Sequence, residues 1–534
     1  MRQILLALLS LIVQLTPIAA TAQLSADFTC TTNDGAITIT GYIGPGGAAT
    51  IPSSIYDIPV TSIGSHAFYG FSSLTNVAIP DSVTSIADYA FCYCTRLSSV
   101  AIPAGVTNIG AAAFADCISL ATVAIPADVS SVGPYAFDNC LGLTAITVDP
   151  QNSFYSSTNG VLFDQSQATL VECPCGMAGS YTIPNSVTKV GPWAFDGCTY
   201  LTDVTIPNGV ASIGDWAFSD CWSLLAINVG PSNASYSSIN GVLFNQNQTT
   251  LIRAPLGNTG SYSIPGTVTS IANYAFEGCS LSSVIIPNSV TNIGNGAFDA
   301  CKRLTDITIP KSVTSMGDSP FEACLELTGI TVEAGNPVYS SVNGVLFGQD
   351  LTVLIEYPNS LGGSYMIPDG VTSIAEVAFE YCAGLTNVTV PGSVINVGSY
   401  AFYGCPGLTS ASFEGNAPAA DSSVFGGDNQ LTAVYYVPGT AGWGATFCGI
   451  PTAPSTLPYP LIVNNRPSLG VEGGQLAFTI LWATNLSVVV EACTNLASPA
   501  WQPLQTNSLT GGFYRFSDAE GANGAARFYR VRTQ

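Results

Sequence analysis

The chain has 534 residues, of which 12 are Lys or Arg, 34 are Asp or Glu and one is His, so its formal net charge is −22. Charged residues make up only 9% of it and hydrophobic residues 47%, so Ser, Thr, Asn, Gly and backbone groups must wet its surface. The acidic balance argues against nucleic acid as a partner, and a single His leaves little room for His-based catalysis or multi-His metal sites.

The first 22 residues have the pattern of a secretory signal peptide. Met1-Arg2 gives a short positive start, an apolar run extends from Ile4 to Val13, and Ala20-Thr21-Ala22 is a small-x-small cleavage site. The run is shorter than the roughly 20 residues that a membrane-spanning helix needs. We therefore expect cleavage near Ala22 and a mature chain without a transmembrane helix, secreted or associated with the cell surface or envelope.

A 23-residue period organises the chain from residue 51 to residue 440. The unit reads Ile-Pro-x-x-Val-Thr-x-Ile-Gly-x-x-Ala-Phe-x-x-Cys-x-x-Leu-Thr-x-Val-x, and a decayed copy starts at Phe425. Units this short cannot bury their own apolar face, so they must stack as a solenoid. The Phe column of eleven good copies comprises Phe68, Phe91, Phe114, Phe137, Phe195, Phe218, Phe276, Phe298, Phe321, Phe379 and Phe402.

The Leu-Thr-x-Val-x-Ile-Pro stretch alternates apolar and polar residues, which predicts a short strand that ends at the proline. Strands of successive coils then lie parallel, about 4.8 Å apart, with Leu, Val and Ile pointing inward. The residues between them form a flat polar face whose affinity would come from area and repetition. Candidate binding positions on this face are Asp203, Thr205, Asp306 and Thr308.

This unit resembles the BspA-like class of bacterial leucine-rich repeats over about residues 51–440. The stretch from Gly35 to Val60 resembles that family's N-terminal entry, so residues 23–50 are expected to form an entry or cap. The resemblance implies a curved leucine-rich-repeat solenoid, poor in helix, with short parallel strands. It also implies export, since known members act as surface adhesins.

Three of the steps between Ile-Pro positions are 58 residues long and hold 35-residue inserts. Each insert carries Tyr-Ser-Ser-x-Asn-Gly-Val-Leu-Phe, starting at Tyr155, Tyr236 and Tyr339, followed by a second short apolar run. Asn-Gly before an apolar run predicts a tight turn, so we expect extra strands that widen the solenoid on one edge. Each insert is either a ligand-contacting projection or a longer repeat that only stacks.

The end of the chain departs from the period. Residues 441–460 are rich in Gly, Thr and Pro and are expected to form a linker. Residues 461–534 predict a small β-sandwich-like domain, and they resemble C-terminal modules of large exported bacterial proteins. This part has 5 basic and 4 acidic residues, against 6 and 30 in residues 23–460. Its arginines are either an attachment surface for anionic glycan or ordinary solvated residues; they include Arg515, Arg527, Arg530 and Arg532.

Sixteen cysteines would usually suggest disulfides in an exported chain, but ten of them share one repeat column. A column three residues after a buried Phe predicts a ladder of small buried thiols rather than bridges. The column comprises Cys94, Cys117, Cys140, Cys198, Cys221, Cys279, Cys301, Cys324, Cys382 and Cys405. The sequence leaves open whether the other six form disulfides: Cys30, Cys92, Cys173, Cys175, Cys448 and Cys493.

Two further columns flank Ala-Phe. The residue before it is often aromatic, and stacked rings either hold sugars or cover the convex face; the candidates are Tyr135, Trp193, Trp216 and Tyr274. The residue after Phe is often acidic, which fits a solvated stripe or oxygen ligands for calcium. These carboxylates are Asp138, Asp196, Glu277, Asp299, Glu322 and Glu380. His66 reads as a substituted member of the aromatic column.

The sequence contains no Gly-x-Ser-x-Gly, Walker-type or His-Glu-x-x-His motif. We therefore expect no catalytic residues, metal or cofactor. The leading hypothesis is an exported, non-enzymatic binding or adhesion protein whose partner is a protein or glycan at a cell surface. The alternatives are a carbohydrate-binding or carbohydrate-active envelope protein, and a structural spacer.

Overall fold

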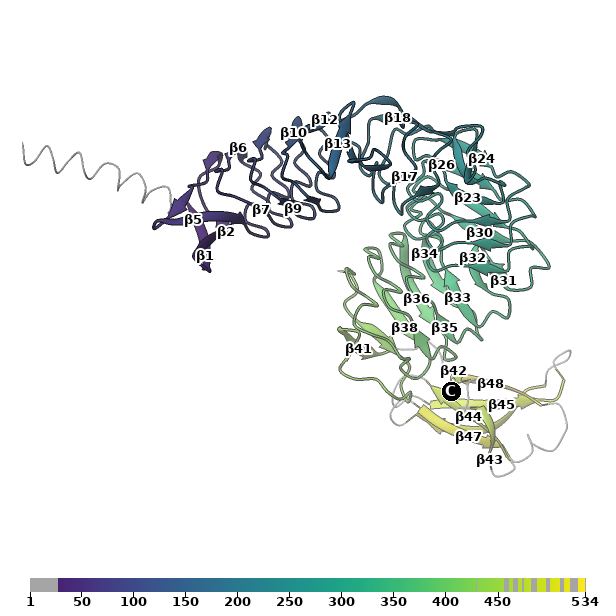
Figure 1. The fold of residues 1–534 in the computed structure, drawn as a ribbon. Coiled ribbons are helices and arrows are strands. Elements are labelled where there is room, and N and C mark those ends of the chain that lie inside the picture. Colours follow the sequence, from purple (N-terminus) through teal and green to yellow (C-terminus); the bar gives the residue numbers. More distant parts are fainter. Residues whose placement is uncertain are drawn as a thin grey trace, which may run out of the picture. The chain divides into compact units, whose positions relative to one another are not determined.

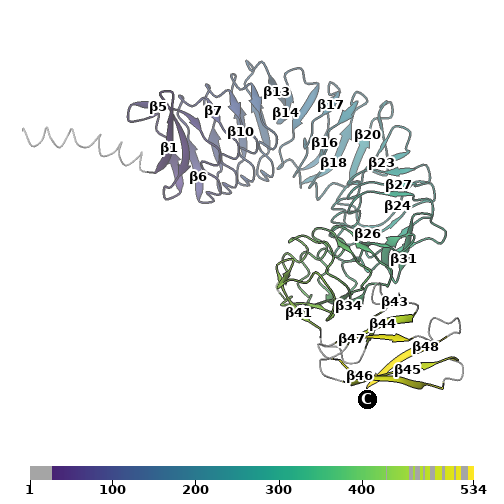
Figure 2. The ribbon, with the colours of Figure 1, turned by 90° about the horizontal axis from the view of Figure 1, so that it is seen from below.

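The structure is a computed structural model, which describes residues 27–428, 430–455, 461–463, 469–472, 475–481, 487–495, 500–509, 513–518 and 527–533. The expected signal peptide and residues 456–460 lie outside the described residues. The chain divides into two compact units, residues 1–258 and 259–534. Figures 1 and 2 show stacked coils of short strands in each unit, and every regular element of the described residues is a strand.

Each coil contributes one strand to a parallel sheet, as the Leu-Thr-x-Val pattern predicts. Val77 pairs with Val100 of the next coil, and Leu74 and Val77 are buried while Asn76 is exposed. We call this the Leu-Val sheet. In the first unit its strands are β3 (Gly47–Thr50), β6 (Leu74–Ala78), β8 (Ser99–Ala101), β10 (Thr122–Ile125), β12 (Ala145–Val148), β16 (Gly179–Thr182), β18 (Leu201–Ile206) and β20 (Ala226–Val229). In the second unit they are β24 (Gly260–Ser263), β26 (Leu281–Ile285), β28 (Asp306–Ile309), β30 (Gly329–Val332), β34 (Gly363–Met366), β36 (Leu385–Val390), β38 (Ser410–Phe413), β39 (Val434–Tyr436) and β41 (Ile450–Pro454).

A second parallel sheet, which the pattern did not predict, comes from the Val-Thr-x-Ile-Gly part of each coil. Ile86 pairs with Ile109 in strands mostly two residues long, too short to show a period of two in the sequence. We call it the Ser-Ile sheet. Its strands are β5 (Ile58–Ile63), β7 (Ser85–Ile86), β9 (Asn108–Ile109), β11 (Ser131–Val132), β17 (Lys189–Val190) and β19 (Ser212–Ile213) in the first unit. The second unit has β25 (Ser270–Ile271), β27 (Asn292–Ile293), β29 (Ser315–Met316), β35 (Ser373–Ile374) and β37 (Asn396–Val397).

The Ala-Phe turn closes the third side of each coil. The N–H of Phe68 donates to the carbonyl of Ala90 in the next coil at 2.7 Å, and the rings of Phe68 and Phe91 stack with centroids 4.7 Å apart. The residue two positions before Phe has φ between 47° and 60° in all eleven of these turns, although bulky residues rarely adopt a left-handed backbone. This backbone conformation lets every second main-chain N–H of the turn donate a hydrogen bond to a carbonyl of the next coil. These residues are His66, Tyr89, Ala112, Tyr135, Trp193, Trp216, Tyr274, Gly296, Ser319, Val377 and Tyr400.

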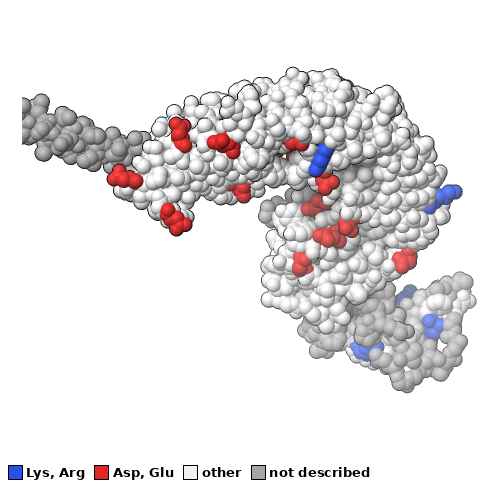
Figure 3. Space-filling view, viewed as in Figure 1, with Lys and Arg blue, Asp and Glu red and all other residues white. Residues whose placement is uncertain are grey.

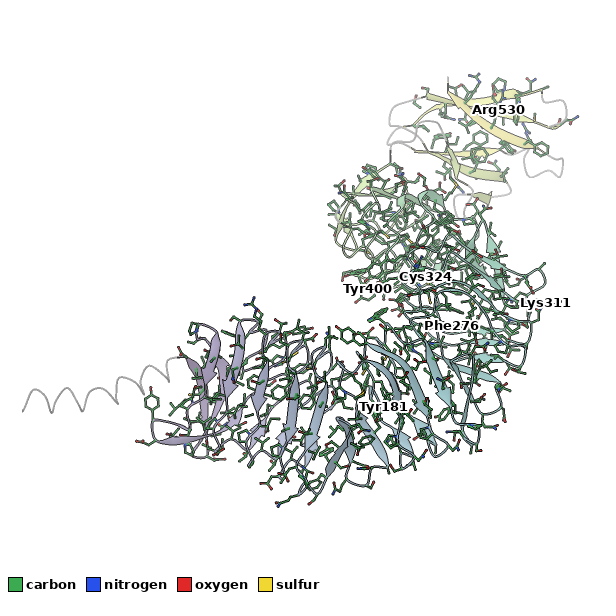
Figure 4. All side chains as sticks on the ribbon, turned by 90° about the horizontal axis from the view of Figure 1, so that it is seen from above. Tyr181, Phe276, Lys311, Cys324, Tyr400 and Arg530 are labelled. Carbon is green, nitrogen blue, oxygen red and sulfur yellow. The ribbon has the colours of Figure 1, made fainter. Side chains whose placement is uncertain are left out.

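The predicted thiol ladder is present. Each column thiol is buried, and Sγ of Cys117 donates to the carbonyl of Phe91 in the preceding coil at 3.2 Å, as Cys324 does to Phe298 at 3.1 Å. Figure 4 labels Cys324 among the side chains of the second unit. All sixteen cysteines lie within the described residues and all are free, including the six whose pairing the sequence left open.

The structure adds Cys175 to the thiol ladder, although its spacing in the sequence leaves it outside the ten-member column. The N–H of Cys173 donates to the carbonyl of Ala194 at 2.8 Å, so Cys173 takes the Phe position of the insert. Cys175 is buried, its Sγ lies 3.4 Å from the carbonyl of Asp196, and it adjoins Cys198. Cys175 therefore belongs to the ladder, and the shorter turn of the insert hides the equivalence.

Each insert is an enlarged coil with three strands. In the first insert, the turn of the predicted hairpin has Asn159 and Gly160 at φ of 53° and 81°. The third strand pairs antiparallel with the hairpin and parallel with β17, so it joins the Ser-Ile sheet. The insert strands are β13 (Tyr155–Thr158), β14 (Val161–Asp164), β15 (Thr169–Glu172), β21 (Tyr236–Ile239), β22 (Val242–Asn245), β23 (Thr250–Arg253), β31 (Tyr339–Val342), β32 (Val345–Gly348) and β33 (Val353–Glu356).

The hairpin replaces a neighbouring strand in the Leu-Val sheet. The N–H of Ile146 in β12 donates to the carbonyl of Gly160 at 2.8 Å, and that of Val148 donates to Oγ of Ser157 at 3.0 Å. The strand β12 ends one sheet and β16 begins the next. The Leu-Val sheet is therefore interrupted at the insert.

A buried Asn anchors each insert on the preceding coil. Nδ2 of Asn152 donates to the carbonyls of Pro126 and Val129 at 2.7 and 2.9 Å, and its Oδ1 accepts from the main-chain N–H groups two and three residues later. Asn233 and Asn336 repeat this arrangement. These contacts favour the alternative in which the inserts stack as longer coils.

The two ends of the array are covered by aromatic side chains. At the start, β1 (Phe28–Asn33) and β2 (Ala36–Tyr42) form a hairpin, β4 (Ser54–Ile55) pairs β5, and the ring of Tyr42 stacks on Phe68 at 5.2 Å. At the other end, the expected linker from residue 441 instead contains β40 (Thr446–Phe447) and β41, which pairs with β39. Trp443 and Phe447 both pack on Phe413, with ring centroids 5.3 Å away. These aromatic contacts explain why the segment folds onto the sheet.

The described C-terminal residues form two antiparallel sheets with a shared core, as the sandwich-like expectation requires. Phe478 and Phe516 come from one sheet and Val488 and Val490 from the other. The strands are β42 (Leu461–Val463), β43 (Leu469–Glu472), β44 (Gln475–Leu481), β45 (Ser487–Cys493), β46 (Gln502–Ser508), β47 (Phe513–Asp518) and β48 (Phe528–Thr533).

Candidate functional site

The candidate residues on the Leu-Val sheet are not buried: Asp306 and Thr308 are exposed, and Asp203 and Thr205 are half-buried. Asp203 of β18 accepts hydrogen bonds from the hydroxyls of Ser180 at 3.2 Å and Thr202 at 2.8 Å. Asp306 of β28 accepts one from Thr305 at 2.9 Å. Thr205 and Thr308 follow in the same strands, in the two separate units. Asp203 and Thr205 therefore belong to one unit, and Asp306 and Thr308 to the other.

Two of the four aromatic candidates come together in the first unit. The rings of Tyr135 and Trp193 belong to the coils on either side of the first insert, and their centroids lie 4.4 Å apart. Trp216, on the following coil, is 36% exposed, and Tyr274 belongs to the second unit. The insert therefore pairs Tyr135 with Trp193 rather than extending one aromatic stripe.

A pocket of about 240 Å³ opens beside this ring pair. Its carboxylates come from three consecutive coils, because Asp138 and Asp196 follow the Phe column and Glu172 ends the last strand of the insert between them. Lys189 at the rim is exposed. The lining residues are Val132, Gly133, Pro134, Tyr135, Asp138, Thr169, Val171, Glu172, Lys189, Gly191, Pro192, Trp193 and Asp196.

The pocket disfavours the ionised forms of Glu172 and Asp138. Burial, reinforced by Asp138, raises the pKa of Glu172 to about 8, while its Oε1 accepts a hydrogen bond from the N–H of Phe137. Burial likewise raises the pKa of Asp138 to about 6. A ligand that donates hydrogen bonds or carries positive charge would relieve both effects.

An equivalent pocket of about 440 Å³ lies at the third insert, in the second unit. Glu356 holds the place of Glu172 at the end of the insert's last strand, and Glu322 and Glu380 stand where Asp138 and Asp196 do. The aromatic pair is absent, because Ser319 and Val377 occupy its positions. The lining residues are Met316, Gly317, Asp318, Ser319, Pro320, Tyr339, Ile355, Glu356, Ala375 and Glu376.

The sequence predicted the flanking carboxylates but not the central one. Glu172 and Glu356 follow short apolar runs that were interpreted only as strands. The available signal is that the residue two positions after the Leu of that run is charged in all three inserts, as Glu172, Arg253 and Glu356.

The remaining acidic candidates do not form a metal site. Glu277 and Glu322 flank Asp299 on successive coils of the second unit, and burial, with a smaller contribution from these two glutamates, raises the pKa of Asp299 to about 7. No group of three or more His, Cys, Asp or Glu among the described residues is arranged to hold a metal ion. His66 hydrogen-bonds to Ser65 and stacks on Tyr89 at 5.0 Å, as a member of the aromatic column.

The arginines of the C-terminal strands are largely paired. Arg530 and Arg532 contact Glu491 at 2.7 and 2.9 Å, and Arg527 contacts Asp518 at 3.2 Å. Arg530, labelled in Figure 4, also lies over the ring of Trp501 at 4.5 Å. These contacts favour ordinary structural arginines over a free anion-binding surface. In the described part of the chain, no helix is long and apolar enough to cross a membrane.

Comparison with known proteins supports the family that the repeat unit resembles. The family model described as "BspA type Leucine rich repeat region (6 copies)" matches residues 61–177, 173–262, 256–347 and 357–441. No curated protein matches the chain.

Similar solved structures are leucine-rich repeat proteins. One from Eubacterium ventriosum is 22% identical and covers 77% of this chain and 88% of its own, with a TM-score of 0.39. A leucine-rich cell surface protein from Faecalibacterium prausnitzii is 26% identical and covers 77% and 86%, with a TM-score of 0.34. One from Bacteroides ovatus is 21% identical and covers 73% and 93%, with a TM-score of 0.30. Because the TM-scores are low, the repeat match itself carries the assignment: the chain belongs to the BspA-type leucine-rich repeat family.

Proposed function

We propose that this chain is an exported, non-enzymatic binding protein that holds a protein partner at a cell surface. The observation that carries the proposal is the first-unit pocket, where the rings of Tyr135 and Trp193 meet three carboxylates. Concave sites with aromatic walls and a few convergent polar groups are typical of ligand binding. Export is supported by the signal-peptide pattern of residues 1–22 and by the surface location of BspA-type proteins.

The test is a binding screen with the secreted chain against cell-surface and matrix proteins. Trp193→Ala removes one wall of the pocket and should weaken binding of a captured partner at least tenfold. Trp222→Ala is the matched control, since Trp222 is 46% exposed and does not line the pocket. Equal losses in the two variants would contradict this site.

A glycan ligand is the second candidate, because aromatic rings beside carboxylates also suit sugars, through stacking and hydroxyl hydrogen bonds. A glycan array distinguishes the two. Binding to one glycan class that is lost in Trp193→Ala would favour the carbohydrate alternative, and no binding to either panel would favour a spacer. Trp216→Ala and Thr205→Ala test whether the binding surface of the first unit extends beyond the pocket, and Tyr274→Ala tests the aromatic candidate of the second unit.

A further inference from the structure

Glu356 is a buried carboxylate without a partner. It is 3% exposed, ends β33 in the third insert and lines the 440 Å³ pocket of the second unit. The structure gives its side chain no hydrogen bond or ion pair. Burial raises the pKa of Glu356 well above its ordinary value, and the nearby Cys324 and Glu322 raise it further because of their negative charge when ionised. A side chain this costly to bury calls for a compensating group.

The neighbours of Glu356 add negative charge. Oε2 of Glu380 is buried with no hydrogen-bond donor, and burial followed by Glu322 raises the pKa of Glu380 to about 8. Asp318 and Glu376 are exposed at the rim, and the lining residues include no Lys, Arg or His. Figure 3 shows that acidic side chains outnumber basic ones on the visible face of the solenoid. The pocket is therefore complementary to a cation.

The chain itself indicates which cation fits. The second insert has the same hairpin and the same last strand, but its final residue is Arg253, at the position of Glu356. Arg253 is 8% exposed, so this coil accommodates a buried guanidinium at that position. Its charge lowers the pKa of Cys221, against the larger effect of burial. The third insert has the same hairpin and last strand, but the side chain at this position is the acidic Glu356.

We propose that the pocket at the third insert receives the guanidinium group of an arginine side chain carried by a protein partner. The inference rests on the proposed function, because it names the chemistry by which a partner is held. A guanidinium presents a planar fork of N–H donors that matches a carboxylate, and Glu356 lines the pocket with a carboxylate to which the structure gives no donor. The apolar walls, including Met316 and Ile355, suit the methylene stem of the side chain.

The experiment titrates the full secreted chain with acetyl-Gly-Arg-Gly-amide and with the citrulline analogue, which has the same shape without the charge. Calorimetry should show that the arginine peptide binds and the citrulline peptide binds at least tenfold more weakly. Binding should release protons at pH 7, measured as a dependence of the heat on buffer ionisation, because the carboxyls ionise to pair with the guanidinium. High salt should weaken binding.

Four variants locate the site. Glu356→Gln should weaken binding of the arginine peptide at least tenfold, and Glu326→Gln, an exposed glutamate of the preceding coil, should leave it unchanged. Glu356→Arg reproduces the second insert and should remain folded while losing the peptide. If Glu356→Gln fails to fold, Glu376→Gln at the rim should still weaken binding about threefold by removing one favourable charge.

The outcomes separate this inference from the proposed function. Equal binding of the two peptides, or equal affinity in the Glu356→Gln and Glu326→Gln chains, overturns the arginine site even if a protein partner is captured. Binding of agmatine without binding of the peptide also overturns it, because the occupant is then a free small molecule. Failure to bind any protein in the screen contradicts the proposed function, whatever the peptides do.

Discussion

Oε1 of Glu172 accepts a hydrogen bond of 3.1 Å from the main-chain N–H of Phe137. This contact ties the last strand of the first insert to the Phe column of the preceding coil. It also brings a third carboxylate beside Asp138 and Asp196, so the insert and the coils around it share one cluster of carboxylates.

Stability should fall as the pH rises from about 5 to 8. A carboxyl whose pKa is raised on folding contributes stability below its unfolded pKa of about 4, and loses it as the pH rises through the folded pKa. The folded pKa values are about 6 for Asp138, about 7 for Asp299 and Asp428, and about 8 for Glu172 and Glu380. Urea denaturation across this range measures the effect. Glu172→Gln should flatten the curve, Glu326→Gln should not, and a rise in stability with pH would contradict the prediction.

The thiol ladder should resist labelling. In the folded chain, a thiol reagent should modify Cys30 rapidly and Cys448 slowly, because only these two cysteines are not buried. Urea should release the other fourteen. Mass mapping follows each site, and regular disulfides between column cysteines would contradict the ladder.

Cys117→Ser should cost little stability, because the carbonyl of Phe91 is already placed to accept from the new hydroxyl. We expect a loss of about 1 kcal/mol or less in the free energy of unfolding, no larger than for Cys117→Ala. Chemical denaturation of both variants checks this ordering. A Ser variant much less stable than the Ala variant would mean that the carbonyl does not accept the bond.

Removing the buried anchor of an insert should be costly. Asn152→Ala leaves the carbonyls of Pro126 and Val129 and two N–H groups without partners, so the free energy of unfolding should fall by about 3 kcal/mol. Asn185→Ala, at an exposed position, is the control and should change it by less than about 0.5 kcal/mol. Equal effects would show that the anchor contributes nothing.

The C-terminal coil should be needed to cover the array. A chain ending at residue 440 loses Trp443 and Phe447 and should expose Phe413, whereas a chain ending at residue 455 keeps this cover. The shorter chain should bind more hydrophobic dye, melt at lower temperature and aggregate. If the two chains melt alike, residues 441–455 are not the cap.

The repeating features of the fold could be predicted because each column repeats its chemistry. The Leu and Val of the strand, the Phe stack and the Cys ladder all occupy the positions that the period predicts. The Ser-Ile sheet was not predictable, since strands such as β7 are held by pairing between coils rather than by a local pattern. Cys175 was missed because the turn that carries it is shorter in the insert than in the regular coils.

The candidate site was predictable only in part. Tyr135 and Trp193 are 58 residues apart in the sequence, and their pairing requires knowing that the two rings meet across the insert. Glu172 and Glu356 come between carboxylates of flanking coils for the same reason. Sequence offsets alone do not show which charges of an insert meet those of the regular repeats.

The interruption of the Leu-Val sheet at an insert bears on how the array comes apart. Where β12 meets a hairpin instead of a parallel neighbour, the ladder that would transmit unfolding from coil to coil is broken, and the Ser-Ile sheet likewise ends at β11, while β15 and β17 belong to the next sheet. Nearest-neighbour coupling sets the cooperativity of a repeat array, so a weak junction divides it into blocks. Hydrogen exchange should therefore show that the protection of main-chain amides changes abruptly at the insert and does not vary gradually from coil to coil. A tethered chain under tension would yield one block at a time.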